Sequence, residues 1–226
     1  MCGIAAPAWA RTASADGLEE TASAQSAPEA TGGEFAPSPE SGPEPGAHLH
    51  DGLYYRIAFG AGYVKATTNN GSEVTGWGFS PEFWVGGSPV AGLALGGTFG
   101  IVAVPNPDAA ITAADSGGLG PISGEAQGLA TYSTYGLFAD YYPNPRAGLH
   151  IMAGLNFSSF KFIPDSGNAS QPATGVGVFG GIGYEWWAGQ QWSVGPLVRL
   201  HWASVSDDSG ATSILSPVIM LGVTNH

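Results

Sequence analysis

The residues of this chain that could do chemistry are a few histidines, serines and carboxylates. Nucleophilic hydrolysis of a lipid ester would need a serine bonded to a histidine base that an acid orients. His150 and Ser158 share one face of an expected strand, but eight residues of strand span about 26 Å, so these two cannot pair. The chain also has no Gly-x-Ser-x-Gly elbow. We therefore interpret His150 and His201 as interior residues bonded to Asp140 or Glu185, and expect no catalytic residues.

Metal-binding patterns are weak as well. "HLHD" (residues 48–51) places two histidines on one strand face beside a carboxylate, which could ligate a metal. A two-histidine half-site is incomplete, however, and a polar start to the first strand is the better interpretation. The single cysteine, Cys2, excludes an intrachain disulfide framework and a cysteine-based zinc site. We therefore expect no metal site and no cofactor.

Composition limits the class of protein. Charged residues make up only 11% of the 226 residues, well under the roughly one quarter usual for soluble domains. Glycine and tryptophan are abundant (36 and 7 residues), and no stretch approaches the ~20 apolar residues of a spanning helix. Together these features favour β-structure in lipid or a β-rich soluble protein. The net charge of −12 argues against nucleic acid as a partner.

The N-terminal part differs in composition from the rest. "MCGIAAPAWA" ends in a small-x-small pattern typical of a signal-peptidase site, so residues 1–10 are interpreted as a residual signal-peptide segment. Residues 11–47 are rich in Pro, Ala, Ser and Glu and cannot bury enough apolar area to offset chain entropy. We expect a disordered acidic linker there, followed by a β-domain over residues 48–226.

From Leu53 onward, apolar residues recur with a period of two. Eight segments show this alternation, many over ten or more residues, whereas ordinary strands have about 5–6 and a tilted strand that crosses a bilayer about 9–11. These segments are 53–64, 74–87, 90–103, 127–142, 148–162, 174–187, 191–205 and 212–224. Short turns at 87–89, 143–147 and 188–190 alternate with longer polar loops at 65–73, 104–126, 163–173 and 206–211.

Alternating short and long connections are typical of outer-membrane barrels, whose short turns face the periplasm. The pattern predicts an all-β fold, an eight-stranded antiparallel up-and-down transmembrane β-barrel with a disordered N-terminal extension. An even number of strands places both ends of the barrel domain in the periplasm.

The strong charges within the segments oppose the bulky apolar row of their own strand. In a barrel this narrow the interior is filled by side chains, and buried charges must be paired. We therefore predict a lumen ion-pair network of Arg56, Glu82, Asp140, Glu185, Arg199, His150 and His201. A bulge at Pro81, Pro196 or Pro217 would reverse the facing of residues downstream.

Aromatic residues gather near the short turns. Tyr55, Tyr141, Trp186 and Trp192 fall on the outward rows, where rings prefer the boundary between membrane and water. We expect them to form an interfacial girdle at the periplasmic end.

Residues 50–226 resemble the small eight-stranded outer-membrane barrels of the OmpA transmembrane-domain type. More narrowly, "HDGLYYRIAFGAGY", "GLFADYYPNPRAGLH" and "GYEWWAGQQWSVGPLVRL" resemble uncharacterised Gly-rich barrels common in myxobacteria. The resemblance implies the outer membrane of a Gram-negative bacterium and supplies no established activity.

Three functions stay open. The first is a non-enzymatic outer-membrane barrel that contacts membrane lipid and lipopolysaccharide and meets a surface partner through loop 104–126. The second is a soluble, lipocalin-like barrel that binds a small apolar ligand, with the bulky row facing inward. The third is a lipid-modifying barrel enzyme of the outer membrane.

Overall fold

The computed structural model describes residues 48–112, 120–167, 169–208 and 210–226. The expected signal segment (1–10) and acidic linker (11–47) lie outside the described residues. The β-domain that was expected from residue 48 is described almost completely.

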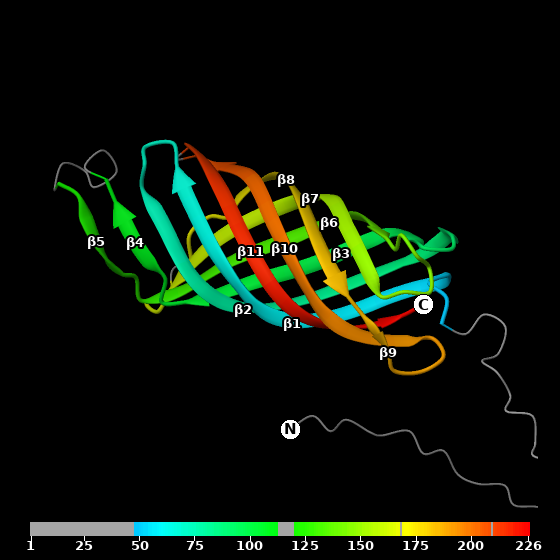
Figure 1. The fold of residues 1–226 in the computed structure, drawn as a ribbon. Helices are drawn as coiled ribbons and strands as arrows, with labels where there is room; N and C mark the ends of the chain where they lie inside the picture. The colour runs from blue at the N-terminus through cyan, green and yellow to red at the C-terminus, as the bar shows by residue number, and fades with distance from the viewer. Residues whose placement is uncertain (1–47, 113–119, 168, 209) are drawn as a thin grey trace, which may run out of the picture. The chain divides into compact units, whose positions relative to one another are not determined.

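Eight long antiparallel strands form a closed barrel, which confirms the predicted fold class (Figure 1). The strands are β1 (Gly52–Thr68), β2 (Glu73–Val90), β3 (Leu93–Pro105), β6 (Gly128–Tyr141), β7 (Leu149–Pro164), β8 (Ala173–Tyr184), β10 (Trp192–Asp207) and β11 (Gly210–Asn225). Each pairs with its neighbours in sequence order, and β1 pairs with both β2 and β11, so the sheet closes on itself. Within the described ranges, no helix is long and apolar enough to cross a membrane.

The connections define two ends of the barrel. The turns β2–β3, β6–β7 and β9–β10 lie at one end, here called the short-turn end, together with β9 (Trp186–Trp187) and the C-terminal residue (Figure 1). β1, β3, β7 and β10 end, and β2, β6, β8 and β11 begin, at the opposite, long-loop end (Figure 1). The strands reach further toward the long-loop end than the alternation predicted, because Lys65–Thr68 of β1 continue to pair with residues 212–215 of β11.

The expected loop at 104–126 contains regular structure that the sequence pattern did not reveal. β4 (Asp108–Ile111) and β5 (Ile122–Glu125) pair antiparallel, and β4 also pairs with Glu73–Thr75 of β2. Backbone pairing with the first residues of β2 therefore extends the sheet beyond the barrel. The β4–β5 hairpin projects from the long-loop end (Figure 1).

The three prolines inside strands do not disturb the register. Pro81 lies opposite Phe59, Pro196 opposite Leu221 and Pro217 opposite Leu200, each in an unshifted ladder. Rungs are missing beside each proline: between β2 and β3 at Pro81, between β1 and β11 at Pro217, and between β8 and β10 at Pro196. A proline has no N–H to donate to the ladder. Among the strand pairings, the register shift lies at Gly87–Val90, next to a short turn.

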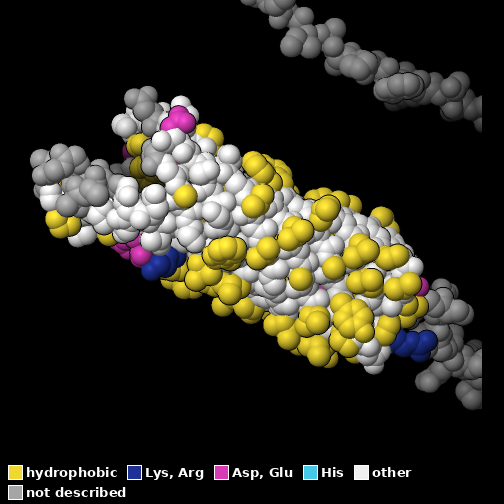
Figure 2. Space-filling model, turned by 90° about the horizontal axis from the view of Figure 1, so that it is seen from above, with side chains coloured by type: hydrophobic (Ala, Val, Ile, Leu, Met, Phe, Trp, Pro, Cys, Tyr) yellow, Lys and Arg dark blue, Asp and Glu magenta, His cyan; other side chains and the backbone are white. Residues whose placement is uncertain are grey.

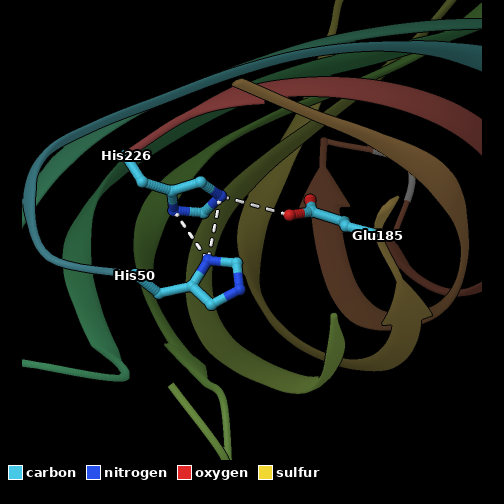
Figure 3. A group of neighbouring side chains, drawn as sticks. All are labelled: His50, Glu185 and His226. Atoms are coloured by element: carbon cyan, nitrogen blue, oxygen red, sulfur yellow. Dashed lines mark hydrogen bonds and ion pairs between the residues drawn. The ribbon is translucent and has the colours of Figure 1, made fainter. Parts of the chain in front are cut away.

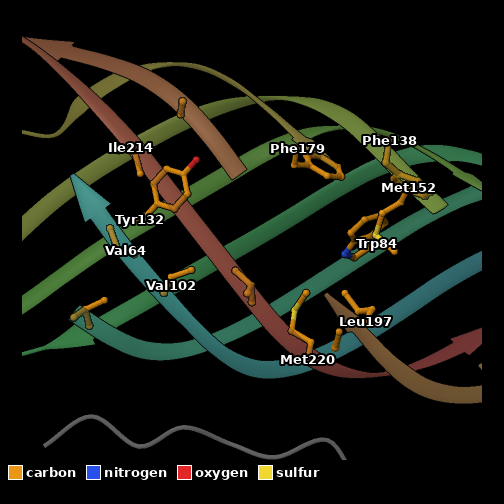
Figure 4. Close-up of a cluster of buried hydrophobic side chains, with 14 of the residues drawn as sticks. Val64, Trp84, Val102, Tyr132, Phe138, Met152, Phe179, Leu197, Ile214 and Met220 are labelled. Carbon is orange, nitrogen blue, oxygen red and sulfur yellow. The ribbon is translucent and has the colours of Figure 1, made fainter. Parts of the chain in front are cut away.

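This register gives the barrel wall an outer and an inner face that differ in their side chains. Large apolar side chains cover the outer wall of the barrel, while charged side chains lie toward its ends (Figure 2). The inner face is buried and filled by side chains (Figure 4). Trp84, Phe138, Met152, Phe179, Leu197 and Met220 gather toward one end of the lumen, and Val64, Val102, Tyr132 and Ile214 toward the other.

Glycines on the inner face make room for large lumen side chains, as Gly183 of β8 shows. A Cβ at Gly183 would overlap Nε2 of the buried His150, whereas one at Gly180 on the outer face would have its nearest neighbour 3.8 Å away. Gly183→Ala should therefore destabilise the barrel by about 1–3 kcal/mol through overpacking. Gly180→Ala is the matched control on the same strand.

The measurement is the denaturant midpoint of the two variants in detergent micelles. An equal midpoint for both would show that His150 does not pack against Gly183 as described.

Candidate functional site

A buried arginine joins two carboxylates near the short-turn end of the lumen. Nη2 of Arg56, on β1, lies 2.6 Å from Oε1 of Glu185 and 3.0 Å from Oδ2 of Asp140. Its Nε donates to Oγ1 of Thr224 at 2.9 Å, and Nη2 also reaches the hydroxyl of Tyr142 at 3.1 Å. A guanidinium with several donors in a fixed plane suits such multiple pairing.

Each carboxylate has further donors that the sequence patterns did not reveal. Asp140 accepts from the hydroxyl of Tyr54 at 2.8 Å and contacts Nδ1 of His150 at 2.7 Å. Glu185 accepts from the hydroxyls of Ser193 and Thr224, both at 2.6 Å. Tyr54, Ser193 and Thr224 all occupy inward positions, so alternation placed them in the lumen, but it could not show which charge each would meet.

A second, separate ion pair joins Arg199 of β10 to Glu82 of β2. The indole of Trp84 donates to Glu82 at 3.2 Å. Both guanidiniums lie over this indole, with the Cζ of Arg199 at 5.0 Å and that of Arg56 at 5.5 Å from a ring centroid. Cation–π attraction of this kind lowers the cost of burying both cations. The predicted charged residues thus form two groups rather than one network.

His201 lies apart from both groups. Its Nδ1 is 3.5 Å from the amide of Asn156, which accepts from Oγ of Ser158 at 2.6 Å, and no contact with Asp140 or Glu185 is present among the described residues. The expectation that His201 bonds to one of those carboxylates is therefore not met, because the ring of His201 packs on Phe179 instead. His150 and Ser158 have separate partners, and both are fully buried.

Residues 48–50, here called the lead-in segment, cross the barrel mouth at the short-turn end. The N–H of His48 donates to Gln190 and that of His50 to Pro145, each at 3.0 Å. The carbonyl of His50 accepts from the N–H of Gly92 at 2.7 Å. These three bonds connect the lead-in segment to the β9–β10, β6–β7 and β2–β3 turns in that order, so it ties the short turns together.

A column of five rings fills the same mouth. His48 stacks on Trp187 (centroids 5.2 Å apart), Trp187 on His50 (4.6 Å), His50 on Tyr142 (3.7 Å) and Tyr142 on His150 (4.9 Å). "HLHD" therefore stacks both of its histidines on one indole, rather than placing them around a shared ion. Burial, with the neighbouring His226 ring second, lowers the pKa of His50 from 6.5 to about 3, so this imidazole is neutral at pH 7.

His50 belongs instead to a cluster with Glu185 and His226 (Figure 3). Nδ1 of His50 lies 3.0 Å from Nε2 of His226, which is 3.2 Å from Oε2 of Glu185. All three residues are buried, and their ligand atoms lie within 4.8 Å of one another. Sequence reasoning missed His226, because a lone histidine beyond the last strand gives no spacing pattern.

The predicted interfacial aromatics lie near the short turns. Tyr55 and Trp192 are both opposite Asn225, and their rings meet edge to face at 5.4 Å. Tyr141 ends β6, and Trp186, in β9, is outward-facing and exposed. The exposed Trp77 and the half-buried Tyr63, with ring centroids 5.4 Å apart, form a similar pair nearer the long-loop end that the alternation did not reveal.

The Arg199–Glu82 pair allows a double-mutant test. Arg199→Met or Glu82→Gln alone should cost about 3–5 kcal/mol, because each leaves a buried group without its partner. The double variant should lose clearly less unfolding free energy than the two single variants lose together, since neither buried group is then left without its partner. Denaturant unfolding of the four proteins in micelles measures both values. Strictly additive losses would contradict the pairing.

Comparison with known proteins adds no family. No family model and no curated protein matches this chain. Among solved structures, Neisserial surface protein A matches with 18% identity over 76% of this chain and 96% of that chain, with a TM-score of 0.48. Ail, the attachment invasion locus protein of Yersinia pestis, matches with 10% identity over 77% and 99% (TM-score 0.45). The outer membrane protein OprG from Pseudomonas aeruginosa matches with 14% identity over 79% and 98% (TM-score 0.44).

Proposed function

We propose that this chain is a non-enzymatic barrel of the Gram-negative outer membrane. Its side-chain-filled lumen serves as a rigid scaffold, and its long-loop end carries a surface for recognition. Membrane lipid and lipopolysaccharide are its surroundings, and nucleic acid is not a partner.

The observation that carries this proposal is the inside-out distribution of polarity. Large apolar residues are exposed along the outer rows of the strands, among them Leu137 (70%), Leu155 (66%) and Val176 (70%), while the ion pairs are buried inside. Monomeric soluble proteins rarely expose a contiguous apolar patch above a few hundred Å². A lipid-facing wall explains the arrangement, because hydrocarbon replaces water around it. The lipocalin-like alternative would need the large apolar residues to point into the barrel, whereas they point outward.

The interfacial rings indicate how the barrel is oriented in the membrane. Tyr55, Tyr141, Trp186 and Trp192 lie at the level where rings prefer the membrane–water boundary, next to turns of the length found on the periplasmic side. The β4–β5 hairpin then projects from the cell. The resemblance to barrels of the OmpA transmembrane-domain type and to Gly-rich myxobacterial barrels agrees with this orientation.

The hairpin is the best candidate for contact with a surface partner. In β4 and β5, Ile111 and Ile122 are exposed and lie opposite each other, as do Asp108 and Glu125 at the other end of the hairpin. The lumen, by contrast, is closed by the lead-in segment and the ring column. A role at the cell surface therefore fits the structure better than chemistry or passage through the interior.

A lipid-facing wall makes a specific prediction about charge. Leu155→Arg should destabilise the barrel in a lipid bilayer by about 2–4 kcal/mol, because the new cation faces hydrocarbon near mid-strand. Ser123→Arg, on the exposed hairpin, is the control and should be neutral within about 0.5 kcal/mol. Reversible unfolding from vesicles gives both values. A protein that stays monodisperse without detergent and tolerates Leu155→Arg would refute membrane insertion.

Sidedness can be tested by labelling in whole cells, in a Cys2→Ser background. Ser123→Cys should react with a membrane-impermeant maleimide in intact cells, because the hairpin lies outside. Gln190→Cys, in the β9–β10 turn, should react only after the outer membrane has been permeabilised. The reverse pattern would contradict the orientation.

A further inference from the structure

Three side chains from distant parts of the sequence converge at the closed barrel mouth. His50 comes from the lead-in segment, Glu185 lies between β8 and β9, and His226 follows β11 (Figure 3). Their exposed fractions are 2%, 4% and 5%, so water reaches them poorly. Buried imidazole and carboxylate groups that face one point need either protons or a cation between them.

The hydrogen bonding of His50 fixes where its lone pair points. Its Nε2 lies 3.2 Å from the carbonyl oxygen of Ala147, which can only accept, so Nε2 carries the proton. Nδ1 therefore presents a lone pair toward His226. Donation of the second ring N–H to a backbone carbonyl is the usual arrangement around a metal-ligating histidine.

Nε2 of His226 is surrounded by more acceptors than one proton can serve. It lies 3.0 Å from Nδ1 of His50, 3.1 Å from Oγ of Ser193 and 3.2 Å from Oε2 of Glu185. The hydroxyl proton of Ser193 is donated to Glu185, so Oγ of Ser193 also presents a lone pair. Nδ1 of His226 also lies 3.1 Å from Nδ1 of His50, so a proton on either nitrogen of His226 could meet the lone pair of His50. A single imidazole proton still cannot serve all three acceptors, whereas a cation would.

The distances and charges suit a small divalent ion. Zinc bonds of about 2.0–2.1 Å in a tetrahedron place neighbouring ligand atoms roughly 3.3 Å apart. Nε2 of His226 lies 3.0 Å from Nδ1 of His50 and 3.2 Å from Oε2 of Glu185, and all three ligand atoms lie within 4.8 Å of one another. Oε1 of Glu185 is engaged by Arg56 and Thr224, whereas Oε2 accepts from the hydroxyls of Ser193 and Tyr142 and is the oxygen that faces His226, so Oε2 is the ligand atom. The two carboxylates, Asp140 and Glu185, outnumber the one guanidinium of Arg56, so a further cation improves the local balance.

We propose that His50, His226 and Glu185 bind one divalent transition-metal ion of the zinc class, contrary to the expectation from sequence. The set of two imidazoles and a carboxylate favours zinc, cobalt or nickel over calcium or magnesium, which prefer oxygen ligands alone. The ion joins the lead-in segment to both the β8–β9 junction and the end of β11. Its role is structural, and it is independent of the proposed surface function.

The test uses the full-length chain without an affinity tag, folded in detergent micelles and stripped with EDTA. Titration with Zn²⁺ should show one ion bound per chain, and the ion should raise the unfolding midpoint. Co²⁺ should give the visible absorption bands of a tetrahedral site. His50→Gln and His226→Gln should each weaken zinc binding at least 100-fold. The matched control, His48→Gln, keeps all three ligands and should bind like the unmodified chain.

Two results would overturn the proposal: the absence of stoichiometric binding by the unmodified chain, or equal binding by the His50→Gln and His226→Gln variants. If those variants do not fold, X-ray absorption at the zinc edge of the unmodified protein decides. A spectrum with two imidazoles supports the site, and one without imidazole excludes it.

Discussion

Arg56 has to keep its charge fully buried inside a barrel whose interior is filled by side chains. Moving an ion out of water costs several kcal/mol even after relaxation, so the guanidinium persists only because two carboxylates and a threonine hydroxyl surround it. Those partners come from β6, the β8–β9 junction and β11, strands that meet only when the barrel is closed. Pairing of this charge and closure of the barrel therefore depend on each other.

The short-turn end follows from the same constraint. Asp140 and Glu185 lie close to the mouth, where solvent would compete for their hydrogen bonds. The lead-in segment and the stacked rings of Trp187, His50 and Tyr142 cover this mouth. Lower water access strengthens every electrostatic contact beneath it. The histidines of "HLHD" thus act mainly as flat packing surfaces, and only His50 also turns a nitrogen toward the cluster.

The alternation of apolar residues was enough to locate the eight long strands. It also predicted that residues such as Arg56 and Glu82 point inward, because a period of two fixes the side of every side chain once a strand is recognised. It could not place β4 and β5, since their pairing depends on an edge of β2 that exists only in the folded sheet. It also could not separate Arg199–Glu82 from the group around Arg56. Which inward residues meet is set by how neighbouring strands are staggered around the barrel, and periodicity within one strand does not contain that information.

The location of the paired charges also bears on where function can lie. Buried ion pairs and stacked rings fill the lumen and fix it, so small changes there cost stability without exposing a reactive group. The outer wall is apolar and uniform, which suits lipid and offers little specificity. The long-loop end differs from both, because the β4–β5 hairpin combines exposed backbone edges, two isoleucines and the facing carboxylates Asp108 and Glu125. Recognition needs such mixed polar and apolar surface, and a rigid barrel beneath it lowers the entropy lost on binding.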